Sequence, residues 1–461
     1  MSRTILTAAG MREAEAAAVA AGTSGAELME RAGAAAAEAV WRFAGPLPAL
    51  ILCGPGNNGG DGYVIARRLA ERGAAVRVAA LAEPGSPEAI AARARWPGPV
   101  EDLAGAGPAP LLIDALFGTG LARPLDGPLW RRLGELAGEA RIRVAIDLPS
   151  GAATDDGALL SPVPDFDLTV TFGALKPSHL LQPAARHMGR IVVADIGVAA
   201  PGRLREIGRP RFASPGPDDH KYSRGFVAVH GGAMPGAAAL VAAAAVRSGA
   251  GYVRMVAEAW IAGLPRAVVQ TPGQTWRGLD DRRIGAVVIG PGFGLGQESW
   301  AAIEAALGSA APLVLDADAL THLAVRGVET LHEAAAVPVL TPHAGEFARL
   351  FPDLQGSKVE RSLAAAARAR AVVVHKGPDT VVAAPDGRAA IAGAPSGWLA
   401  TAGTGDVLTG VVAAMRARGL DAFEAACAGV WLHGRAASLA GPGLIADDLL
   451  DRLPAALASC I

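Results

Sequence analysis

Cysteine is rare in this chain of 461 residues, with three scattered copies at Cys53, Cys427 and Cys460. No CxxC or CxxH spacing connects them, so the sequence predicts neither a disulfide framework nor a structural zinc site. A chain with few cysteines and no disulfides suits a reducing compartment. We therefore expect a cytoplasmic protein.

An excess of charge of either sign is also missing, because 42 lysines and arginines face 44 aspartates and glutamates, for a net charge of -2. This balance predicts no basic patch for nucleic acid or for an acidic membrane. The first residues carry Arg12, Glu13 and Glu15 where a signal peptide needs an unbroken apolar core, so they predict a helix. We expect small molecules as partners, no nucleic acid and no membrane, and we leave a homo-oligomer open.

Long hydrophobic runs are limited to residues 225–246, which carry no formal charge and could in length span a bilayer. The run divides into a strand, a glycine turn and an alanine-rich helix, whereas a lipid-facing span favours Leu, Ile and Phe. It therefore predicts a soluble βα unit.

Apolar residues make up 51% of the chain, which predicts folding, and the length has room for two large α/β units. Short apolar runs that end in glycine turns and precede helical stretches predict two doubly wound parallel sheets. The expected strands are residues 49–53, 75–81, 110–116, 143–149, 168–173 and 190–197, then 226–230, 252–257, 286–292, 312–318, 338–343, 371–377 and 380–384. Residues 201–221 are rich in Pro, Gly and charge and predict a linker with its boundary near residue 213, between domains 1–208 and 214–461.

A glycine-rich segment, GPGNNGGDG (residues 54–62), follows the first expected strand, and we expect it to be a loop before a helix that starts at Tyr63. Glycines let a backbone approach an anion, and a helix start supplies N–H donors, so the segment predicts a phosphate cradle. Its spacing is neither GxGxxG nor a P-loop, and a glycine turn without a ligand is the alternative. Asp114 and Asp147 end two other strands, where open parallel sheets bind ligands, although such aspartates often only cap the next helix.

Over about residues 1–205 the chain resembles the Rossmann-like epimerase domain of the NAD(P)H-hydrate repair enzymes. The resemblance rests on the N-terminal segment ILTAAGMREAEAAAVAAGTSGAELMERAG, on the glycine-rich segment, and on the motifs DALFGTG and AIDLPSG. The resemblance implies interconversion of the R and S forms of a nicotinamide ring hydroxylated at C6. It implies a potassium ion held by oxygen ligands, as a hard cation prefers, from Asn58, Asp114 and Ser150. The hydrate would contact Asn57, Asn58, Gly59, Gly60, Asp61, Gly118, Thr119, Gly120, Leu121, Ala122, Arg123, Pro124 and Asp147. Asp114 is either the catalytic acid/base or only a ligand of the ion.

A second glycine motif, ATAGTGDVLTG (residues 400–410), opens an apolar helical stretch in the second half. The amides of Gly403, Thr404 and Gly405 predict an anion hole for a phosphoryl group in transit, and Asp406 could accept a proton from the attacking hydroxyl. In the alternative interpretation, Thr404 is an ordinary N-cap and Asp406 complements the helix dipole.

This motif resembles the anion-hole signature of ribokinase-like enzymes, and with VIGPGFG, LDADAL, LTPHAGEFARL and VVHKGPDT it resembles the ADP-dependent NAD(P)H-hydrate dehydratase domain over about residues 214–461. The resemblance implies that ADP phosphorylates the C6 hydroxyl and leaves as AMP, with Mg²⁺ on the nucleotide phosphates. Ala402 and Ser396 depart from the family pattern, and a methyl at Ala402 would crowd the nucleotide if that position needs a positive φ. The nucleotide would contact Lys376, Gly377, Pro378, Asp379, Thr380 and Gly405, and the hydrate Ala237, Gly292, Asp406 and His343, which could instead be an N-cap.

Together the two resemblances imply a bifunctional repair enzyme, an isomerase and a lyase. Two alternatives stay open: a ribokinase-like small-molecule kinase fused to a dinucleotide-binding domain, and a first domain that only binds or scaffolds. Lysine usage is a separate observation, because only Lys176, Lys221, Lys358 and Lys376 occur and all except Lys358 fall in motif segments. A compact ammonium that approaches phosphate as a point charge would explain lysine rather than arginine there.

Overall fold

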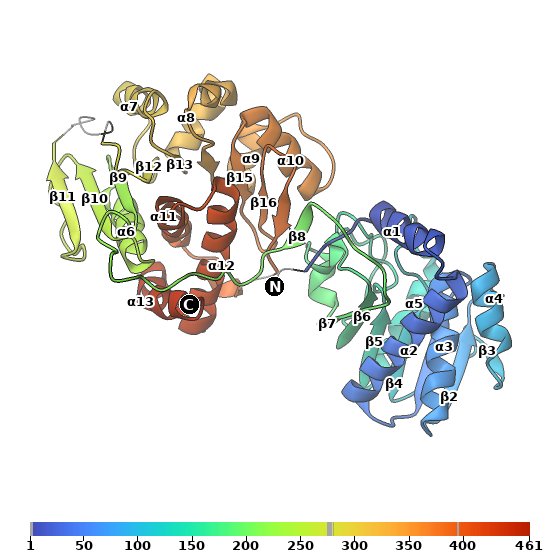
Figure 1. Cartoon of the computed structure of the whole chain (residues 1–461). Helices are drawn as coiled ribbons and strands as arrows, with labels where there is room; N and C mark the ends of the chain where they lie inside the picture. The colour runs from blue at the N-terminus through green and yellow to red at the C-terminus, as the bar shows by residue number, and fades with distance from the viewer. Residues whose placement is uncertain (1–2, 274–278, 280, 394–395) are drawn as a thin grey trace. The chain divides into compact units, whose positions relative to one another are not determined.

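The computed structural model describes the chain except for residues 1–2, 274–278, 280 and 394–395. It separates into two compact units, one of residues 3–202 and one that begins at Arg203 and runs to Ile461. Each unit has a central sheet with helices on both faces, so the prediction of two doubly wound α/β domains is confirmed (Figure 1).

The N-terminal unit is built on a seven-stranded, all-parallel sheet in the order β3-β2-β1-β4-β5-β6-β7. The six predicted strands are present, and the short edge strand β3 was not predicted. The strand order reverses between β1 and β4, and in open parallel sheets ligands bind in a crevice outside the carboxyl ends of the strands at such a switch point. The strands are β1 (Ala49–Cys53), β2 (Val76–Ala80), β3 (Val100–Asp102), β4 (Leu111–Ala115), β5 (Ile142–Ile146), β6 (Leu168–Phe172) and β7 (Arg190–Ala194).

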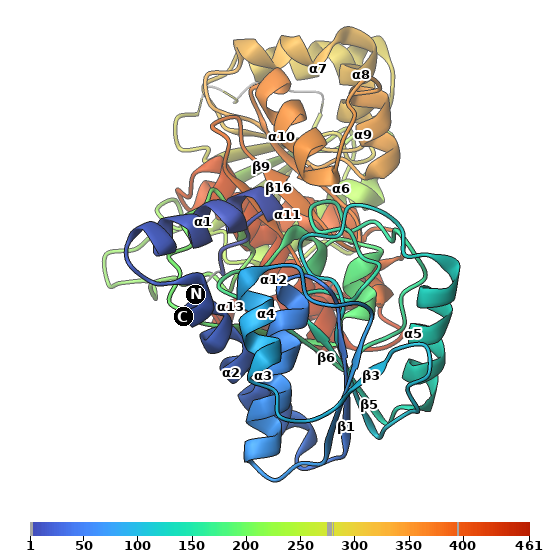
Figure 2. The same cartoon turned by 90° about the vertical axis from the view of Figure 1, so that its right-hand side faces the viewer.

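Helices cover both faces of this sheet, as Figure 2 shows for α2 and α3 on one side and α5 on the other. The helices are α1 (Ala8–Ala20), α2 (Gly25–Ala44), α3 (Asn57–Glu71), α4 (Pro87–Ala94) and α5 (Gly127–Glu139), with the short η1 (Pro177–His179) and η2 (Ala184–His187). The predicted helix start at Tyr63 is wrong, because α3 begins at Asn57. A methyl on Gly59 would lie 1.8 Å from the Gly54 carbonyl oxygen, and one on Gly62 would lie 2.8 Å from Cys53 Sγ. The glycines therefore let a helix, rather than a loop, pack against the end of β1.

The C-terminal unit has a ten-stranded sheet in the order β11-β10-β9-β12-β13-β14-β15-β16-β17-β8. The expectation of a parallel sheet is wrong at one end, because β16 runs antiparallel to both β15 and β17. The strand β8 lies inside the expected linker and pairs with β17, where its backbone completes the edge of the sheet. The strands are β8 (Leu204–Glu206), β9 (Phe226–His230), β10 (Tyr252–Ala257), β11 (Val268–Pro272), β12 (Ala286–Ile289), β13 (Leu313–Leu315), β14 (Val339–Leu340), β15 (Val372–His375), β16 (Val381–Ala383) and β17 (Ala389–Ile391).

Two groups of helices sandwich this second sheet. The helices α6, α11, α12 and α13 pack on one face and α7 to α10 on the other, and Figure 1 shows the two groups below and above the sheet. The helices are α6 (Pro235–Arg247), α7 (Gln297–Leu307), α8 (Asp318–Arg326), α9 (Ala344–Leu350), α10 (Lys358–Ala369), α11 (Thr404–Ala417), α12 (Ala422–Ala440) and α13 (Ala446–Ala458), with η3 (Val328–Glu333) and η4 (Gly397–Leu399).

The uncharged run 225–246 forms β9, a turn and most of α6, as its division in the sequence predicted. Within the described residues, the helices are too short or too polar to cross a bilayer.

Candidate active sites

The first candidate site lies where β1, β4 and β5 end side by side in the N-terminal unit. The predicted residues Asn57 to Asp61 form the first turns of α3, and Ser150 follows β5. Nδ2 of Asn58 is buried without a hydrogen-bond partner among the described residues. The site therefore holds a polar side chain that the protein itself leaves unsatisfied.

Asp114 is fully buried at the end of β4. Its carboxylate accepts hydrogen bonds from the Ser150 hydroxyl (2.7 Å), the Ser150 amide (2.9 Å) and the Leu116 amide (3.1 Å). These donors are all neutral. Burial accordingly raises the pKa of Asp114 to about 6, although the bonds from Ser150 and Leu116 partly oppose the rise.

Asp147 follows β5 with a left-handed backbone, at a φ of 64°, which a non-glycine residue rarely adopts. Its Oδ1 accepts from Lys176 Nζ at 2.7 Å and from the Thr171 hydroxyl at 2.9 Å. Its Oδ2 accepts from the Thr119 amide at 3.1 Å. Burial alone would raise the pKa of Asp147, but the charge of Lys176 outweighs burial and holds that pKa below its usual range.

Two further carboxyl groups, those of Asp61 and Glu15, lie close enough to Asp147 to respond to its charge. Burial and the negative charge of Asp147 raise the pKa of Asp61 well above its usual value. Burial and Asp147 likewise raise the pKa of Glu15 on α1. The N-terminal site thus combines one fixed carboxylate with two groups that tend to hold a proton.

The predicted substrate loop, residues 118–124, is exposed at its tip and anchored at its base. The Phe117 amide donates to the Ser150 hydroxyl, and the Thr154 hydroxyl donates to the Thr119 carbonyl. A methyl on Gly118 would lie 2.8 Å from Asp147 Oδ2 and 3.3 Å from Asn58 Oδ1. The structure therefore brings the predicted residues Asn58, Gly118 and Asp147 together at one point.

The second candidate site is centred on the N-terminus of α11. Gly403 is the N-cap, with a φ of 85°, and Thr404 is the first helical residue. The alternative that Thr404 caps this helix is wrong, because its hydroxyl donates backwards to the carbonyls of Leu399 and Thr401. The first-turn amides of α11 are the unpaired donors of a helix start, the arrangement that binds a phosphoryl group.

A cluster of charged side chains lies beside that helix start. Nζ of Lys376, after β15, lies 3.0 Å from Asp316 Oδ1 and 4.0 Å from Glu346 Oε2. A methyl on Gly405 would lie 3.4 Å from the same ammonium. Burial and the charges of Asp316 and Glu346 raise the pKa of Asp406 to about 6, against the lowering effect of Lys376. Asp406 is therefore a carboxylate poised to take up a proton near neutral pH.

Asp316 is a member of this cluster that was not predicted, although it lies in the quoted motif LDADAL. It is buried, and its second oxygen accepts from the Thr409 hydroxyl of α11 at 2.7 Å. Ala317 beside it has a φ of 49°, another left-handed non-glycine residue. The signal in the sequence was an aspartate at a strand end, which by itself does not distinguish this role from a helix cap.

The three remaining predicted hydrate contacts follow β9, β12 and β14. Ala237 is in the first turn of α6. Gly292 has a φ of 63°, and a methyl there would lie 2.1 Å from the Met234 carbonyl oxygen, so only glycine fits. His343 is the N-cap of α9, where its Nδ1 accepts from the amides of Gly345 and Glu346. The alternative role of His343 as a cap is therefore present, while the rest of its ring is exposed.

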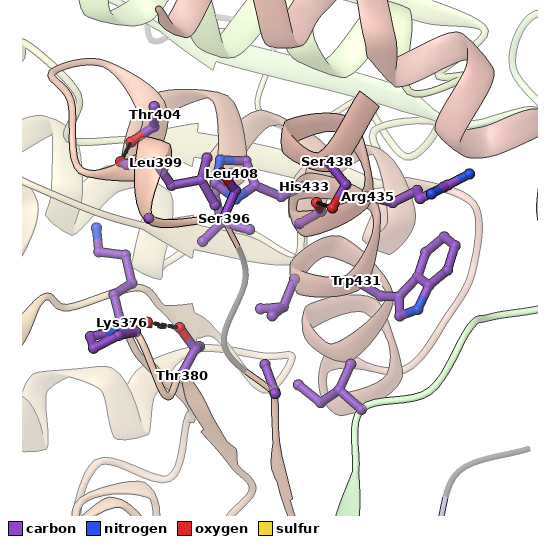
Figure 3. A pocket seen from close by; sticks show the side chains of 18 of the residues that line it. Lys376, Thr380, Ser396, Leu399, Thr404, Leu408, Trp431, His433, Arg435 and Ser438 are labelled. Carbon is purple, nitrogen blue, oxygen red and sulfur yellow. Dashed lines mark hydrogen bonds between the residues drawn. The ribbon is translucent and has the colours of Figure 1, made fainter. Parts of the chain in front are cut away.

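A cavity of about 630 Å³ opens beside the α11 start (Figure 3). Figure 3 shows Lys376 and Thr380 on one side of it and Trp431, His433 and Arg435 of α12 on the other. Five of the six predicted nucleotide contacts line this cavity: Lys376, Gly377, Pro378, Thr380 and Gly405. The sixth, Asp379, is buried and accepts from Lys358 Nζ at 2.6 Å, so it faces α10 instead.

Some wall residues of this cavity were not predicted. Trp431 and His433 come from α12, and Ile207 follows the edge strand β8. The Ile207 amide donates to the Ile391 carbonyl at 2.9 Å, which extends the β8–β17 pairing to the cavity wall. These residues are far from the nucleotide motifs in the sequence, and only the folding of α12 and of the β8 edge brings them to the cavity.

The structure shows the backbone at Ala402 and the surroundings of Ser396, the two departures from the resembled pattern. Ala402 is absent from the described residues with positive φ, and the left-handed conformation falls on Gly403. Ser396 lines the cavity, and its hydroxyl accepts from the Trp398 amide at 3.3 Å. Among the described residues, no group of three or more His, Cys, Asp or Glu side chains could hold a metal ion.

Comparisons with known proteins match segments of both units. Residues 25–178 match the family model described as the YjeF-related protein N-terminus, and residues 227–454 match NAD(P)H-hydrate dehydratase. The bifunctional NAD(P)H-hydrate repair enzyme Nnr of Thermofilum pendens is 34% identical, with 93% of this chain and 91% of that protein covered. The enzyme of the same name from Escherichia coli is 33% identical, with 93% and 88% covered.

A solved structure is similar to part of this chain. The ADP/ATP-dependent NAD(P)H-hydrate dehydratase from Bacillus subtilis, co-crystallized with ATP/Mg²⁺, is 30% identical and aligns with a TM-score of 0.48. The alignment covers 54% of this chain and 95% of that structure.

Proposed function

The chain belongs to the family of bifunctional NAD(P)H-hydrate repair enzymes, and from this membership we propose how its two sites divide the work. The enzyme has two activities, epimerisation of NAD(P)H hydrate and its nucleotide-dependent dehydration. The observation that carries the proposal is that the chain has both family domains in order and that each brings polar residues to the carboxyl edge of its own sheet. Neither a lone kinase nor a scaffold needs both.

In the dehydratase, we assign Asp406 as the base. The C6 hydroxyl of the S hydrate attacks the terminal phosphorus of ADP, Asp406 takes the hydroxyl proton, and AMP leaves. The ring nitrogen's lone pair then expels inorganic phosphate, and loss of the C5 proton restores NAD(P)H. The amides of the α11 start and Lys376 stabilise the charge on the phosphoryl group in transit.

We propose the 630 Å³ cavity as the adenine nucleotide site. Lys376, Gly377, Pro378, Thr380 and Gly405 place the phosphates near the helix start, and Ala237, Gly292 and His343 receive the hydrate. Asp379 would not contact the nucleotide directly. Its carboxylate, paired with Lys358 Nζ, would hold the segment 376–380 in place. Mg²⁺ would be held mainly by the nucleotide's phosphates, because the described residues provide no carboxylate cage for it.

In the epimerase, the crevice residues Asn57 to Asp61, the loop 118–124 and Asp147 would hold the hydrate. We propose Asn58, Asp114 and Ser150 as the ligands of a potassium ion. The donor set fits a monovalent hard cation, because Asp114 is a fully buried carboxylate with neutral hydrogen-bond donors, and a bound cation would supply the missing charge. When bound, the ion would supply positive charge beside the crevice. Because Asp114 is fully buried, we assign it as a ligand of the ion rather than as the acid that meets the substrate.

Separated R and S epimers of hydrated NADH test both activities. With the full chain and ADP, we expect the S epimer to yield NADH, AMP and phosphate in equal amounts. We expect the R epimer to be consumed as well, because the N-terminal unit converts it to the S form. A failure to form AMP or phosphate from the S epimer would overturn the dehydratase assignment, and a stable R epimer would overturn the epimerase assignment.

A further inference from the structure

Lys176 is a fully buried lysine that neither assigned activity uses. It lies after β6 with 1% of its surface exposed. Its Nζ donates to Asp147 Oδ1 at 2.7 Å, to the Thr171 hydroxyl at 2.8 Å and to the Phe172 carbonyl at 3.1 Å. A compact ammonium has three donors, and each has an acceptor here. Burying a charge is costly unless it is paired and hydrogen-bonded, and even a paired buried charge contributes little net stability, so packing alone does not explain this lysine.

The partner of Lys176 is itself held in a strained position. Asp147 has a left-handed backbone, and the His179 ring fixes its carbonyl, with Nε2 2.9 Å from that oxygen. The same ring accepts the Lys176 amide at its Nδ1, so it donates from Nε2. Strained residues that the surroundings over-determine in this way cluster at functional sites.

The Asp147 carboxylate connects this buried group to the substrate loop. A carboxylate has about four acceptor positions. Lys176 and Thr171 occupy two on Oδ1, and the Thr119 amide occupies one on Oδ2. Oδ2 points to the loop, where it lies 2.8 Å from the position of a methyl on Gly118. One acceptor position is therefore left on Oδ2, the oxygen beside the predicted substrate loop.

We infer that Lys176 is a positioning residue of the epimerase site, which keeps Asp147 a carboxylate so that its Oδ2 accepts a hydrogen bond from a hydroxyl of the bound hydrate. The inference rests on the proposed role of the N-terminal unit as the epimerase. It goes beyond that role because it names Lys176 as the group that keeps the substrate-binding Asp147 ionised.

Several titratable groups face Asp147 and determine what happens without Lys176. His179 is neutral, because burial and Lys176 lower its pKa to about 4. Asp61 of α3 and Glu15 of α1 have raised pKa values, and Arg12 lies beside Glu15. The Lys176 ammonium is thus the cation that favours ionised Asp147. Without it, burial favours a protonated Asp147, which has lost an acceptor.

The test is the pH dependence of epimerisation in Lys176→Met, measured by chromatography of R and S NADH hydrate without ADP. We expect KM to rise roughly tenfold or more near pH 7, the cost of one charged hydrogen bond, with a smaller change in kcat. KM should recover toward the wild-type value as the pH is raised above neutral, because a buried carboxyl group without its cation deprotonates only at higher pH. A purely structural loss would not be rescued by alkali.

Thr171→Val is the matched control, because it removes a neutral partner of the same carboxylate and keeps the ammonium. It should raise KM less and without alkaline recovery. An unchanged KM in Lys176→Met, or a loss that is equal at every pH, would overturn the inference.

If Lys176→Met does not fold, Asp147→Asn tests the same step, because an amide cannot be ionised. Its KM should be raised at every pH, and an unchanged KM would overturn the inference. Absence of epimerisation in the wild-type chain would instead refute the proposed function, so the two failures are distinguishable.

Discussion

In both units a lysine lies beside the carboxylate that we place in contact with substrate, but the two lysines have different partners. Lys176 is paired with Asp147 itself, at 2.7 Å. Lys376 is paired with Asp316, at 3.0 Å, while Asp406 stands next to that pair. A cation that binds the carboxylate directly holds it as a fixed anion. A cation that binds a neighbour leaves the carboxylate free to take up a proton, and the neighbouring negative charge makes it more basic.

This comparison matches the chemistry of the two reactions. The dehydratase needs a base whose pKa lies near the working pH, and Asp406 has that property. The epimerase needs a site that holds the hydrate while its hydroxyl leaves and returns, and Asp147 is suited to binding rather than to proton transfer. Substitutions at each site should therefore separate the two activities.

The largest expected effect is the loss of dehydration in Asp406→Asn. Because the amide cannot accept the hydroxyl proton, kcat for the S hydrate with ADP should fall by about 10²–10⁴-fold. The return of dihydronicotinamide absorbance measures this. Epimerisation of the R hydrate should continue, since it depends on the other unit. Normal dehydration in this variant would disprove the role of Asp406 and with it the contrast between the two carboxylates.

The two activities should also respond differently to acid. Asp406 must be ionised to act as a base, so with a pKa of about 6 dehydration should fall roughly tenfold per pH unit below about pH 6. The pKa of Asp147 is held low, so hydrate binding by the epimerase should persist through the same range. Rate profiles of both reactions on one preparation give the comparison.

Asp316→Asn sharpens this prediction. The substitution removes a negative neighbour that raises the pKa of Asp406, so the acid limb of the dehydration profile should move to lower pH. It also removes the ion-pair partner that holds the Lys376 ammonium in place, so the maximal rate of dehydration should fall. A profile that moves to higher pH, or does not move, would contradict the proposed origin of the raised pKa.

A smaller effect is expected from potassium. The pKa of buried Asp114 is raised from 3.8 to about 6 in the folded state, so the stability linked to this group is present below about pH 3.8 and is lost as the pH rises through about 6. The shift corresponds to roughly 3 kcal/mol. A cation bound to the ionised carboxylate would recover part of that loss, at roughly 2–4 °C in Tm per kcal/mol.

Thermal unfolding in KCl and in choline chloride measures this gain. We expect potassium to raise the Tm of the N-terminal unit at pH 8 and to have little effect at pH 5. In Asp114→Asn the potassium effect should disappear. An equal effect at both pH values would mean that the ion does not bind this carboxylate.

The sequence predicted most strands because their apolar runs are continuous and end in turns, as in β1 and β9. It did not predict β8 (Leu204–Glu206) or β17 (Ala389–Ile391), which are short strands defined by their pairing, β17 with β16 and β8 with β17. The start of α3 was placed too late because glycine is a poor helix former. Packing of Gly59 and Gly62 against β1 overrides that propensity.

Much of the candidate sites could be predicted because phosphate-binding helix starts and strand-end aspartates have local signatures. The ion pairs that tune these sites have no such signature. Lys176 and Asp147 are 29 residues apart, and Lys376 and Asp316 are 60 apart. Lys358 seemed to lie outside the motifs, yet it reaches Asp379 across 21 residues. Partners of this kind are decided by the order of strands in the sheet.

The smallest expected effect concerns the departure at Ala402, tested by Ala402→Gly against Gly403→Ala. The left-handed conformation before α11 falls on Gly403, where a methyl would also lie 2.8 Å from Leu240 Cδ1. Gly403→Ala should therefore cost about 1–2 kcal/mol in unfolding free energy and weaken ADP binding. Ala402→Gly should change KM for ADP by less than about twofold, because no strain is relieved there. A marked gain in ADP affinity for Ala402→Gly would mean that the methyl does obstruct the nucleotide and that the anion hole is formed differently from the α11 start described here.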